Sequence, residues 1–284
     1  MARKVWIQGP IAIDTVVYLD NFPSPGSFMN SKKTVERTGG TSANVALGLC
    51  TSGVETNFIC YLGNDDNGKK LREVLEKSEI KNLFITQIDG PSSHALILVD
   101  QNAERTIISM TKPYLRELRM KDVPFEGPDI VSIILWREEF LDDLVRAENL
   151  GCFTVVGASA LVDERVLHAN LVIGSVRDIP AHVNPEDHLH RFDEIVLTDG
   201  LNGSTYYSKE NNFHQSAFEV QALDVTGAGD AFICGYLAAL AHGLAPSKCL
   251  LLASQWAASA VQIDSSIPPA FDVVKDQWRI DLIP

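Results

Sequence analysis

The sequence predicts an α/β protein built around a mostly parallel central sheet, and three features of the chain support that prediction. Short runs of apolar and β-branched residues recur along the chain, and helical patterns lie between them. Most of the runs are apolar at nearly every position, which suits parallel strands covered on both faces. The alternation of strand and helix patterns is typical of βαβ units.

Six apolar runs are expected to form the strands of the main sheet. The first covers residues 5–9 and ends at a glycine, and the second covers residues 56–61. The others cover residues 130–135, 153–156, 171–173 and 195–197. Apolar residues at helical spacing predict a helix over 68–79, and a similar pattern covers 139–150.

Two segments break the alternation and predict β-hairpins. Residues 15–38 hold two strand patterns around a Pro-Gly turn, and residues 92–110 hold two around Gln101-Asn102-Ala103. Neither segment has room for a crossover helix, so each pair is antiparallel. The hairpins are expected to pair into a small sheet that covers a site at the carboxyl edge of the parallel strands. Because that sheet is made of insertions, residues 1–284 are interpreted as a single domain.

Composition and charge exclude several classes of protein. Hydrophobic residues make up 45% of the chain and charged residues 21%, as in an ordinary globular protein. The net charge is −13, which argues against nucleic acid or an anionic membrane as a partner. No stretch offers about 20 uninterrupted apolar residues, so no membrane span is expected. The five cysteines are widely spaced and indicate reduced thiols in a cytoplasmic protein.

The strongest chemical signal is a glycine-rich string that precedes an apolar helix. Residues 224–232 read DVTGAGDAF. Gly227 and Gly229 allow close approach to a ligand, and the unpaired N–H groups at a helix start form an anion site. Asp230 falls in the first helical turn, where a carboxylate can take a hydroxyl proton while the N–H groups hold a phosphoryl group. The competing interpretation is a capping Asp224 and a surface Asp230 that complements the helix dipole.

A second glycine pair precedes another helix. Gly39 and Gly40 begin the string GGTSANVA, and Asn44 falls in the first helical turn. Backbone amides and a side-chain amide in this arrangement suit the hydroxyl groups of a polyol. A flexible turn, with Ser42 or Asn44 capping the helix, would give the same string.

Together these strings resemble the ribokinase/PfkB family of sugar and nucleoside kinases over nearly the whole chain. The resemblance also includes residues 9–14, 22–26, 62–68 and 103–107. It implies a ribokinase-like three-layer sandwich with a small β-sheet lid. It also implies transfer of the γ-phosphate of ATP to a hydroxyl of a small-molecule sugar, with Mg²⁺, and a homodimer formed through the lid.

The resemblance implies a role for each matching residue. Asp230 corresponds to the catalytic base. The anion hole corresponds to Gly227, Ala228 and Gly229. The sugar contacts correspond to Asp14, Gly39, Gly40 and Asn44. The nucleotide contacts correspond to Ser175, Thr198, Gly200, Gly203, Thr226, Gly227 and Gly229.

Two departures from the family pattern concern bound ions. The family's Asn-x-x-Glu motif is replaced by Ser175-Val176-Arg177-Asp178, so Asp178 is expected to act on metal-bound water with one methylene less reach. Residues 264–268 replace a usual Gly-Ala stretch, which weakens the case for a monovalent-cation site.

A narrower resemblance links the chain to ketohexokinase and sulfofructose kinase. Residues 92–94 and 104–107 are similar to that branch, and so is Arg137 after the strand at 130–135. Arg137 is interpreted either as a contact to a sugar hydroxyl or anionic group, or as a solvated charge at the rim. Its acidic neighbours Glu138 and Glu139 would partly neutralise it, which favours a neutral sugar.

The leading prediction is therefore an ATP-dependent carbohydrate kinase acting on a ketose-like sugar. A nucleoside kinase on the same scaffold stays open and would need an apolar base pocket, with Phe22, Phe28 and Tyr114 as candidate linings. A catalytically weak homologue with a regulatory or binding role is the third possibility. The retained Asp230 and anion-hole string argue against it.

Overall fold

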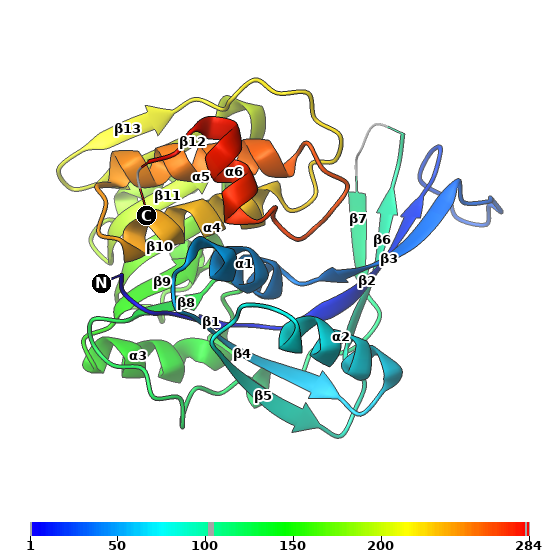
Figure 1. The fold of residues 1–284 in the computed structure, drawn as a ribbon, viewed down its shortest axis with the longest axis horizontal. Helices are drawn as coiled ribbons and strands as arrows, with labels where there is room; N and C mark the ends of the chain where they lie inside the picture. The colour runs from blue at the N-terminus through cyan, green and yellow to red at the C-terminus, as the bar shows by residue number, and fades with distance from the viewer. Residues whose placement is uncertain (1, 102–104, 282, 284) are drawn as a thin grey trace.

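A nine-stranded sheet forms the centre of the computed structural model, which describes residues 2–101, 105–281 and 283 (Figure 1). Its strand order is β13-β12-β11-β10-β9-β8-β1-β4-β5. Seven neighbouring strands are parallel, and β12 and β13 continue the sheet antiparallel. The strands are β1 (Val5–Gln8), β4 (Thr56–Gly63), β5 (Asn82–Ile88), β8 (Ile130–Ile133), β9 (Phe153–Gly157), β10 (Ala169–Ser175), β11 (Phe192–Thr198), β12 (Ser204–Ser208) and β13 (Asn212–Gln215).

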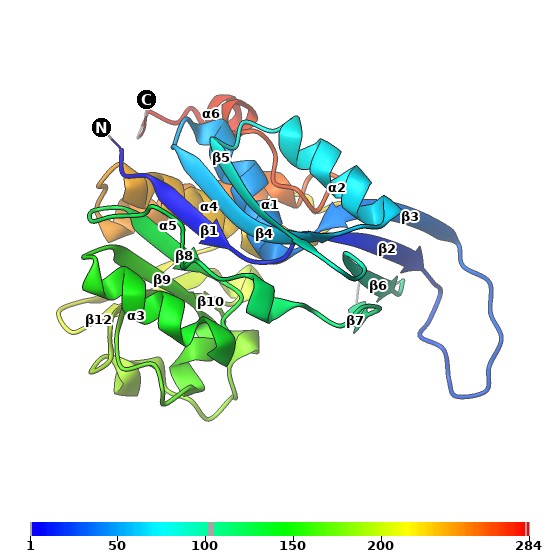
Figure 2. The same ribbon diagram turned by 90° about the horizontal axis from the view of Figure 1, so that it is seen from below.

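Helices cover both faces of the main sheet, so β1, β4 and β8 are buried along their whole length. Figure 2 shows one face covered by α1 (Thr41–Leu49), α4 (Ala228–Ala241), α5 (Pro246–Ala260) and α6 (Phe271–Trp278). The opposite face is covered by α3 (Leu141–Asn149). Helix α2 (Asp66–Glu76) lies on the same side as α1 and packs on β4. No helix in the described ranges is long and apolar enough to cross a membrane. The prediction of an α/β sandwich with a mostly parallel sheet is confirmed.

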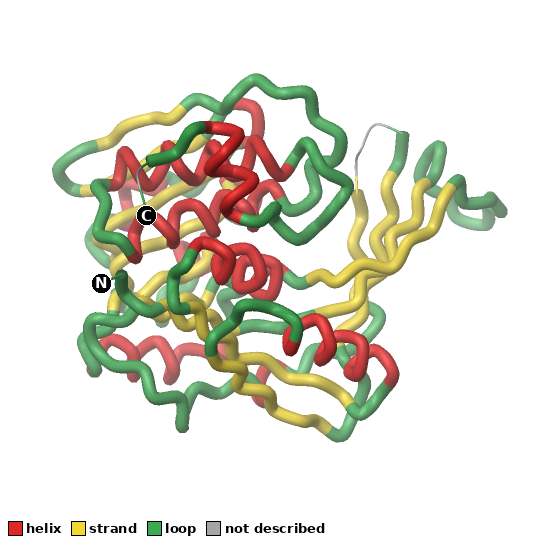
Figure 3. The backbone as a smooth tube through the Cα atoms, in the orientation of Figure 1, coloured by secondary structure: helices red, strands yellow, loops and turns green. Residues whose placement is uncertain are grey.

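A separate four-stranded sheet projects from one end of the molecule, and we call it the lid sheet (Figures 1 and 3). It contains β2 (Ala12–Tyr18), β3 (Lys33–Gly39), β6 (Ser93–Val99) and β7 (Arg105–Ser109) in the order β3-β2-β6-β7. Both predicted hairpins are antiparallel, and a parallel pairing of β2 with β6 joins them. Asn102, Ala103 and Glu104, which belong to a predicted turn and motif, lie outside the described residues.

The connections after two central strands differ from the predicted alternation. Short 3₁₀ turns at Ala158–Val162 and Val176–Asp178 follow β9 and β10, with no α-helix in either connection. These turns keep the carboxyl ends of the neighbouring strands close to the surface. That edge of the sheet is therefore open in front of the start of α4.

Candidate active site

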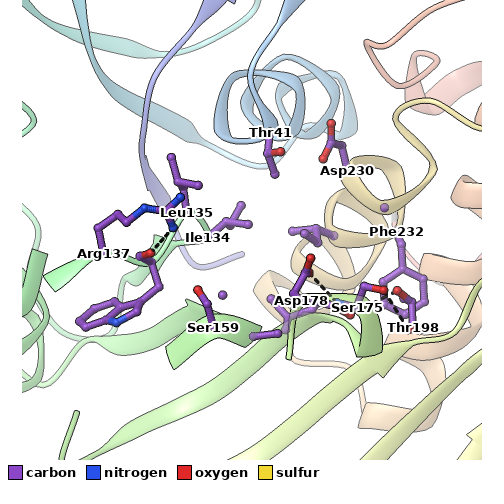
Figure 4. Close-up of a pocket in the computed structure, with 17 residues that line it drawn as sticks. Thr41, Ile134, Leu135, Arg137, Ser159, Ser175, Asp178, Thr198, Asp230 and Phe232 are labelled. Atoms are coloured by element: carbon purple, nitrogen blue, oxygen red, sulfur yellow. Dashed lines mark hydrogen bonds between the residues drawn. The ribbon is translucent and has the colours of Figure 1, made fainter. Parts of the chain in front are cut away.

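A cleft of about 400 Å³ lies where the carboxyl ends of β8 to β11 meet the first turn of α4 (Figure 4). Ligands of open α/β sheets bind at this edge. Figure 4 shows Thr41 and Asp230 on one side of the cleft and Asp178, Ser175 and Thr198 on the other. The remaining polar lining includes Ser159, and Arg137 lies at one end.

The turn before α4 has a shape that requires glycine. Gly227 has a φ of 80°, and a Cβ there would lie 2.5 Å from the carbonyl oxygen of Ser266. The Asp224 carboxylate closes the turn by accepting a hydrogen bond of 2.8 Å from the N–H of Thr226. The glycine string therefore forms a fixed turn at the helix start.

This turn leaves backbone donors available for an anion. Within the described residues, the N–H groups of Gly227, Gly229 and Asp230 have no backbone or side-chain acceptor, whereas that of Ala228 donates to Val225 at 3.4 Å. A Cβ on Gly229 would meet nothing within 4 Å, so open space lies beside it. The positive end of the α4 dipole points at the same place, which makes it suitable for a phosphate.

Asp230 is partly exposed to the cleft and otherwise enclosed by protein. Its Oδ2 accepts a hydrogen bond of 2.8 Å from Nδ2 of the buried Asn44. Burial is the main effect on this carboxyl and raises its pKa to about 7, although Asn44, Arg105 and Thr41 favour the charged form. The charge of Asp14 adds to the rise. A carboxyl with this pKa suits proton transfer near neutral pH.

Asp14 and the glycine pair form the part of the site next to the lid sheet. A Cβ on Gly39 would lie 1.8 Å from Oδ2 of Asp14, so the absence of a side chain makes room for this carboxylate. Gly40 has a φ of 97°, and its Cβ would lie 2.6 Å from a backbone oxygen of the β1–β2 connection. Burial raises the pKa of Asp14 to about 6, while the charges of His94 and Arg37 lower it.

Ser175 and Asp178 form a capping box after β10. The Ser175 N–H donates to Oδ2 of Asp178 at 3.0 Å, and the Ser175 hydroxyl accepts from the N–H of Arg177 at 3.2 Å. The Thr198 hydroxyl of the neighbouring strand donates to the carbonyl of Gly174 at 3.2 Å. These bonds fix Ser175, Asp178 and Thr198 along one wall of the cleft.

The cleft brings together only part of the predicted residues. The lining includes Arg137, Ser175, Asp178, Thr198, Gly229 and Asp230. The other predicted residues lie outside the lining, namely Asp14, Gly39, Gly40, Asn44, Gly200, Gly203, Thr226, Gly227 and Ala228. The sequence interpretation missed Thr41, Ser159 and Phe232, which also line the cleft. Thr41 and Phe232 belong to the two glycine strings, whereas no motif marks Ser159.

Arg137 has different partners from those that the sequence suggested. Its Nη1 donates to the carbonyl of Trp136 at 2.7 Å, and no carboxylate pairs with its guanidinium within the described ranges. Glu138 instead pairs with Arg165, whose Nε also contacts Asp163 at 2.8 Å. These side chains line a second hollow of about 380 Å³ that shares Arg137 with the cleft. Glu138 therefore does not neutralise Arg137 through an ion pair, as the sequence had suggested.

The residues fit a Mg²⁺ ion that arrives with a nucleotide better than a metal held by protein alone. No group of three or more His, Cys, Asp or Glu side chains in the described part of the chain could hold a metal ion. Mg²⁺ keeps several waters and typically uses one or two carboxylates together with substrate phosphates. Asp178 is a carboxylate on the cleft wall opposite Asp230 and matches that requirement.

Comparison with known proteins agrees with the fold and the glycine strings. A model of the pfkB family of carbohydrate kinases matches residues 2–134 and 163–270. A nucleoside kinase of Methanocaldococcus jannaschii is 23% identical over 92% of this chain and 91% of its own length. A fructokinase of Salmonella typhimurium is 24% identical over 89% of both chains.

The fold is shared with solved ribokinase structures. The ribokinase of Thermotoga maritima superposes with a TM-score of 0.83 at 22% identity, covering 98% of this chain and 100% of that one. The matched family segments include both glycine strings and most strands of the two sheets. The chain therefore belongs to the pfkB family of carbohydrate kinases, which are phosphotransferases that act on sugar hydroxyls.

Proposed function

We propose that the chain transfers the γ-phosphoryl group of ATP to a hydroxyl of a carbohydrate, with Asp230 as the general base. One observation supports this most strongly. A carboxyl with a pKa of about 7 lies in the first turn of α4, next to backbone N–H groups that are free to hold an anion. Base and anion site are thus adjacent, as phosphoryl transfer requires.

The proposed step uses the chain's own groups as follows. The acceptor hydroxyl oxygen forms a bond to the γ-phosphorus, the bond from that phosphorus to the β,γ-bridging oxygen breaks, and ADP leaves. The hydroxyl proton passes to Asp230, whose Oδ2 is held by Asn44. The N–H groups of Gly227 and Gly229 stabilise the charge on the transferring group. Mg²⁺ bound with ATP, held by Asp178 through water, would neutralise negative charge on the phosphates.

The acceptor is proposed to be a neutral, ketose-like sugar. Asp14, Asn44 and the backbone around Gly39 and Gly40 offer acceptors and donors for several hydroxyls near Asp230. Residues 92–94 and Arg137, which resemble the ketohexokinase branch, support a ketose. The fructokinase relative is consistent with that choice.

A nucleoside is the second candidate, because a relative from Methanocaldococcus jannaschii is named a nucleoside kinase. The three aromatic residues suggested for a base pocket do not line the cleft. Phe28 is 90% exposed, and Tyr114 packs edge-on against Tyr61 with ring centroids 6.0 Å apart. The proposed sugar contacts also lie outside that lining, so the preference for a sugar rests on the polar groups of Asn44 and Asp14 close to Asp230.

The test is ADP release measured with a panel of ketoses, aldoses, sugar phosphates and nucleosides. We expect stimulation by at least one neutral sugar, and Asp230→Asn should reduce kcat by about 10²- to 10⁴-fold. Glu36→Gln is a suitable control because Glu36 is exposed and pairs only with Lys70 among the described residues. Stimulation by none of these acceptors, or a kcat of Asp230→Asn within about threefold of the parent, contradicts the proposal.

We also propose a homodimer formed through the lid sheets. Strand β7 is an edge of the lid sheet and is exposed at every residue, and Ile107 is 63% exposed. Exposed apolar edge strands tend to pair with another chain. Analytical ultracentrifugation of the parent should give twice the monomer mass. The substitution Ile107→Lys should shift the measured mass toward that of the monomer.

A further inference from the structure

Arg37 places one guanidinium between two carboxylates that belong to different loops. Its Nη1 donates to Oδ2 of Asp224 at 3.0 Å, and its Nη2 contacts Oδ1 of Asp264. Nη2 also donates to the hydroxyl of Tyr18 at 2.7 Å. The Arg37 and Asp224 side chains are 12% and 17% exposed, so water compensates little of their charge.

The same two loops contact each other directly behind the anion site. The Ser266 hydroxyl donates to the carbonyl of Thr38 at 2.7 Å, which ties the loop after α5 to β3. The carbonyl of Ser266 lies against Gly227, where no Cβ would fit. The turn that carries the free N–H groups is thus packed against a loop that β3 holds in place.

We propose that Arg37 is a positioning residue for phosphoryl transfer, which holds Asp224 and the loop after α5 so that the turn at Gly227 keeps its geometry. The inference rests on the proposed function, because it assumes that this turn binds the transferring group. Asp224 is the link, since its other oxygen accepts the N–H of Thr226 within the turn. Arg37 lies in β3 two residues before Gly39, so the same strand also shapes the acceptor side.

Charge explains why an arginine suits this position. The Asp224 carboxylate is poorly hydrated and the Asp264 carboxylate is half exposed, and the two repel each other without a cation between them. The planar guanidinium presents several donors in fixed directions and meets both carboxylates and Tyr18 at once. Burial opposes ionisation of Asp224, but hydrogen bonds from Thr226 and Arg37 bring its pKa below the ordinary value.

The first experiment compares Arg37→Met and Arg37→Lys with the parent, using the best acceptor from the panel. We expect Arg37→Met to lose roughly 10²-fold in kcat, as a misplacement of about 1 Å would cause, with a smaller change in the acceptor KM. Arg37→Lys should recover part of that loss, because its ammonium restores the positive charge but not the several fixed donors of a guanidinium. Glu36→Gln is the matched control, since Glu36 pairs with Lys70 of α2 at 3.0 Å.

The second experiment is chemical rescue. In Arg37→Ala the buried Asp224 would lose its cation, while Asp264 would keep Lys33, whose Nζ lies 3.4 Å from Oδ2 of Asp264. Added guanidinium or potassium ions should therefore raise kcat several-fold and leave the parent unchanged. If the Arg37 variants do not fold, Asp264→Asn tests the positioning role instead. The Asp264 side chain is 48% exposed, so this variant should still fold. It should lower kcat without a large loss of thermal stability.

The outcomes separate this inference from the proposed function. A parent without acceptor-dependent ADP release overturns the proposed function and this inference together. An active parent, with Arg37→Met or Asp264→Asn within about threefold of its kcat, overturns the positioning role alone. A loss in Arg37→Ala that neither cation reverses, or that appears only in the acceptor KM, also overturns it.

Discussion

At the scale of single residues, the pKa of Asp230 connects its surroundings to its proposed chemistry. Asn44 and Thr41 of α1, Asp14 of β2 and Arg105 of β7 all influence this carboxyl, and burial has the largest effect. A base must be deprotonated to accept a proton. Because the pKa is about 7, kcat/KM should rise tenfold per pH unit below about pH 7 and level off above it.

The pH dependence is measured as kcat/KM for the acceptor at saturating ATP. Asp230→Asn should lose this limb of the profile along with most of its activity. Asp14, with a pKa of about 6, adds a second weaker ionisation that Asp14→Asn would remove. A parent profile that stays flat down to about pH 5 would show that the base is not Asp230.

The same carboxyl should lower the stability of the ligand-free protein. A folded pKa near 7 exceeds the ordinary value of 3.8 for an aspartate, so the folded state binds the proton more tightly than the unfolded state. The stabilisation is present below the unfolded pKa and is lost as pH rises through about 7. Asp230→Asn should therefore raise the free energy of unfolding at pH 8, by at most about 4 kcal/mol. Urea unfolding at pH 8 and pH 5 tests this, and an equal gain at both pH values would contradict it.

Asp14 and Asn44 should differ in which kinetic constant they change. Asp14→Ala removes an acceptor for sugar hydroxyls and should raise the acceptor KM by a free energy of about 1.5–3 kcal/mol, with little change in the ATP KM. Asn44→Ala should raise the acceptor KM and also lower kcat, because Asn44 holds Oδ2 of Asp230. Steady-state kinetics with both substrates varied separates the cases. Equal effects on the sugar and ATP KM values would argue against both placements.

Residues in glycine strings could be predicted from sequence, and residues that act through distant partners could not. The strings around Gly39 and Gly227 carry a local signature, because positive φ values and close packing require glycine there. Arg37 and Asp224 are far apart in the chain and meet only when β3 of the lid sheet lies beside the loop before α4. No pattern of neighbouring residues encodes such a contact.

At the scale of elements, buried strands were predictable and edge elements were not. The central strands are apolar because both of their faces are covered. By contrast β12 and β13 read STYYS and NFHQ, which are short and too polar to stand out. Pro180 follows the 3₁₀ turn at Val176–Asp178 and cannot continue it as a helix, whereas Pro185 begins a short 3₁₀ helix at Pro185–His188.

The start of α4 allows a paired test of structure and function. Gly227→Ala should lower the free energy of unfolding by about 1–3 kcal/mol, because φ is 80° and the new Cβ would lie 2.5 Å from a backbone oxygen. Gly229→Ala should keep or raise stability, since this helical position has open space around it and alanine favours helices. It should still lower kcat, because the methyl group would project beside the anion site. Thermal unfolding and kinetics of both variants check this, and a fully active Gly229→Ala would contradict that anion site.

At the scale of the whole molecule, a net charge of −13 should repel anionic acceptors unless a local cation offsets it. Arg137 is the candidate, since it lies at the end of the cleft without a carboxylate partner in the described residues. The family model does not cover residues 135–162, so family membership does not assign this side chain a role. The charged groups around Arg137 must therefore indicate whether the substrate is neutral or anionic.

Those surroundings still favour a neutral sugar, although for a different reason from the one that the sequence suggested. The charged side chains that line the second hollow are three carboxylates and two guanidinium groups, so negative charge exceeds positive charge there. They belong to Glu138, Glu139, Asp163, Arg137 and Arg165. A neutral sugar would accept a hydrogen bond from Arg137 at a hydroxyl, and Arg137→Ala should then cost about 1 kcal/mol in kcat/KM.

Kinetics of the parent, Arg137→Lys and Arg137→Ala with neutral and anionic sugars at low and high salt test this choice. With anionic sugars, the parent should be slow at low salt and faster at high salt, because salt screens the repulsion from the whole chain. If the parent instead prefers an anionic sugar, and Arg137→Ala removes both that preference and its salt dependence, the guanidinium binds the anion and the substrate is charged. If Arg137→Ala changes no substrate's kcat/KM, Arg137 is a solvated charge at the rim, and the ketohexokinase-like interpretation loses its main support.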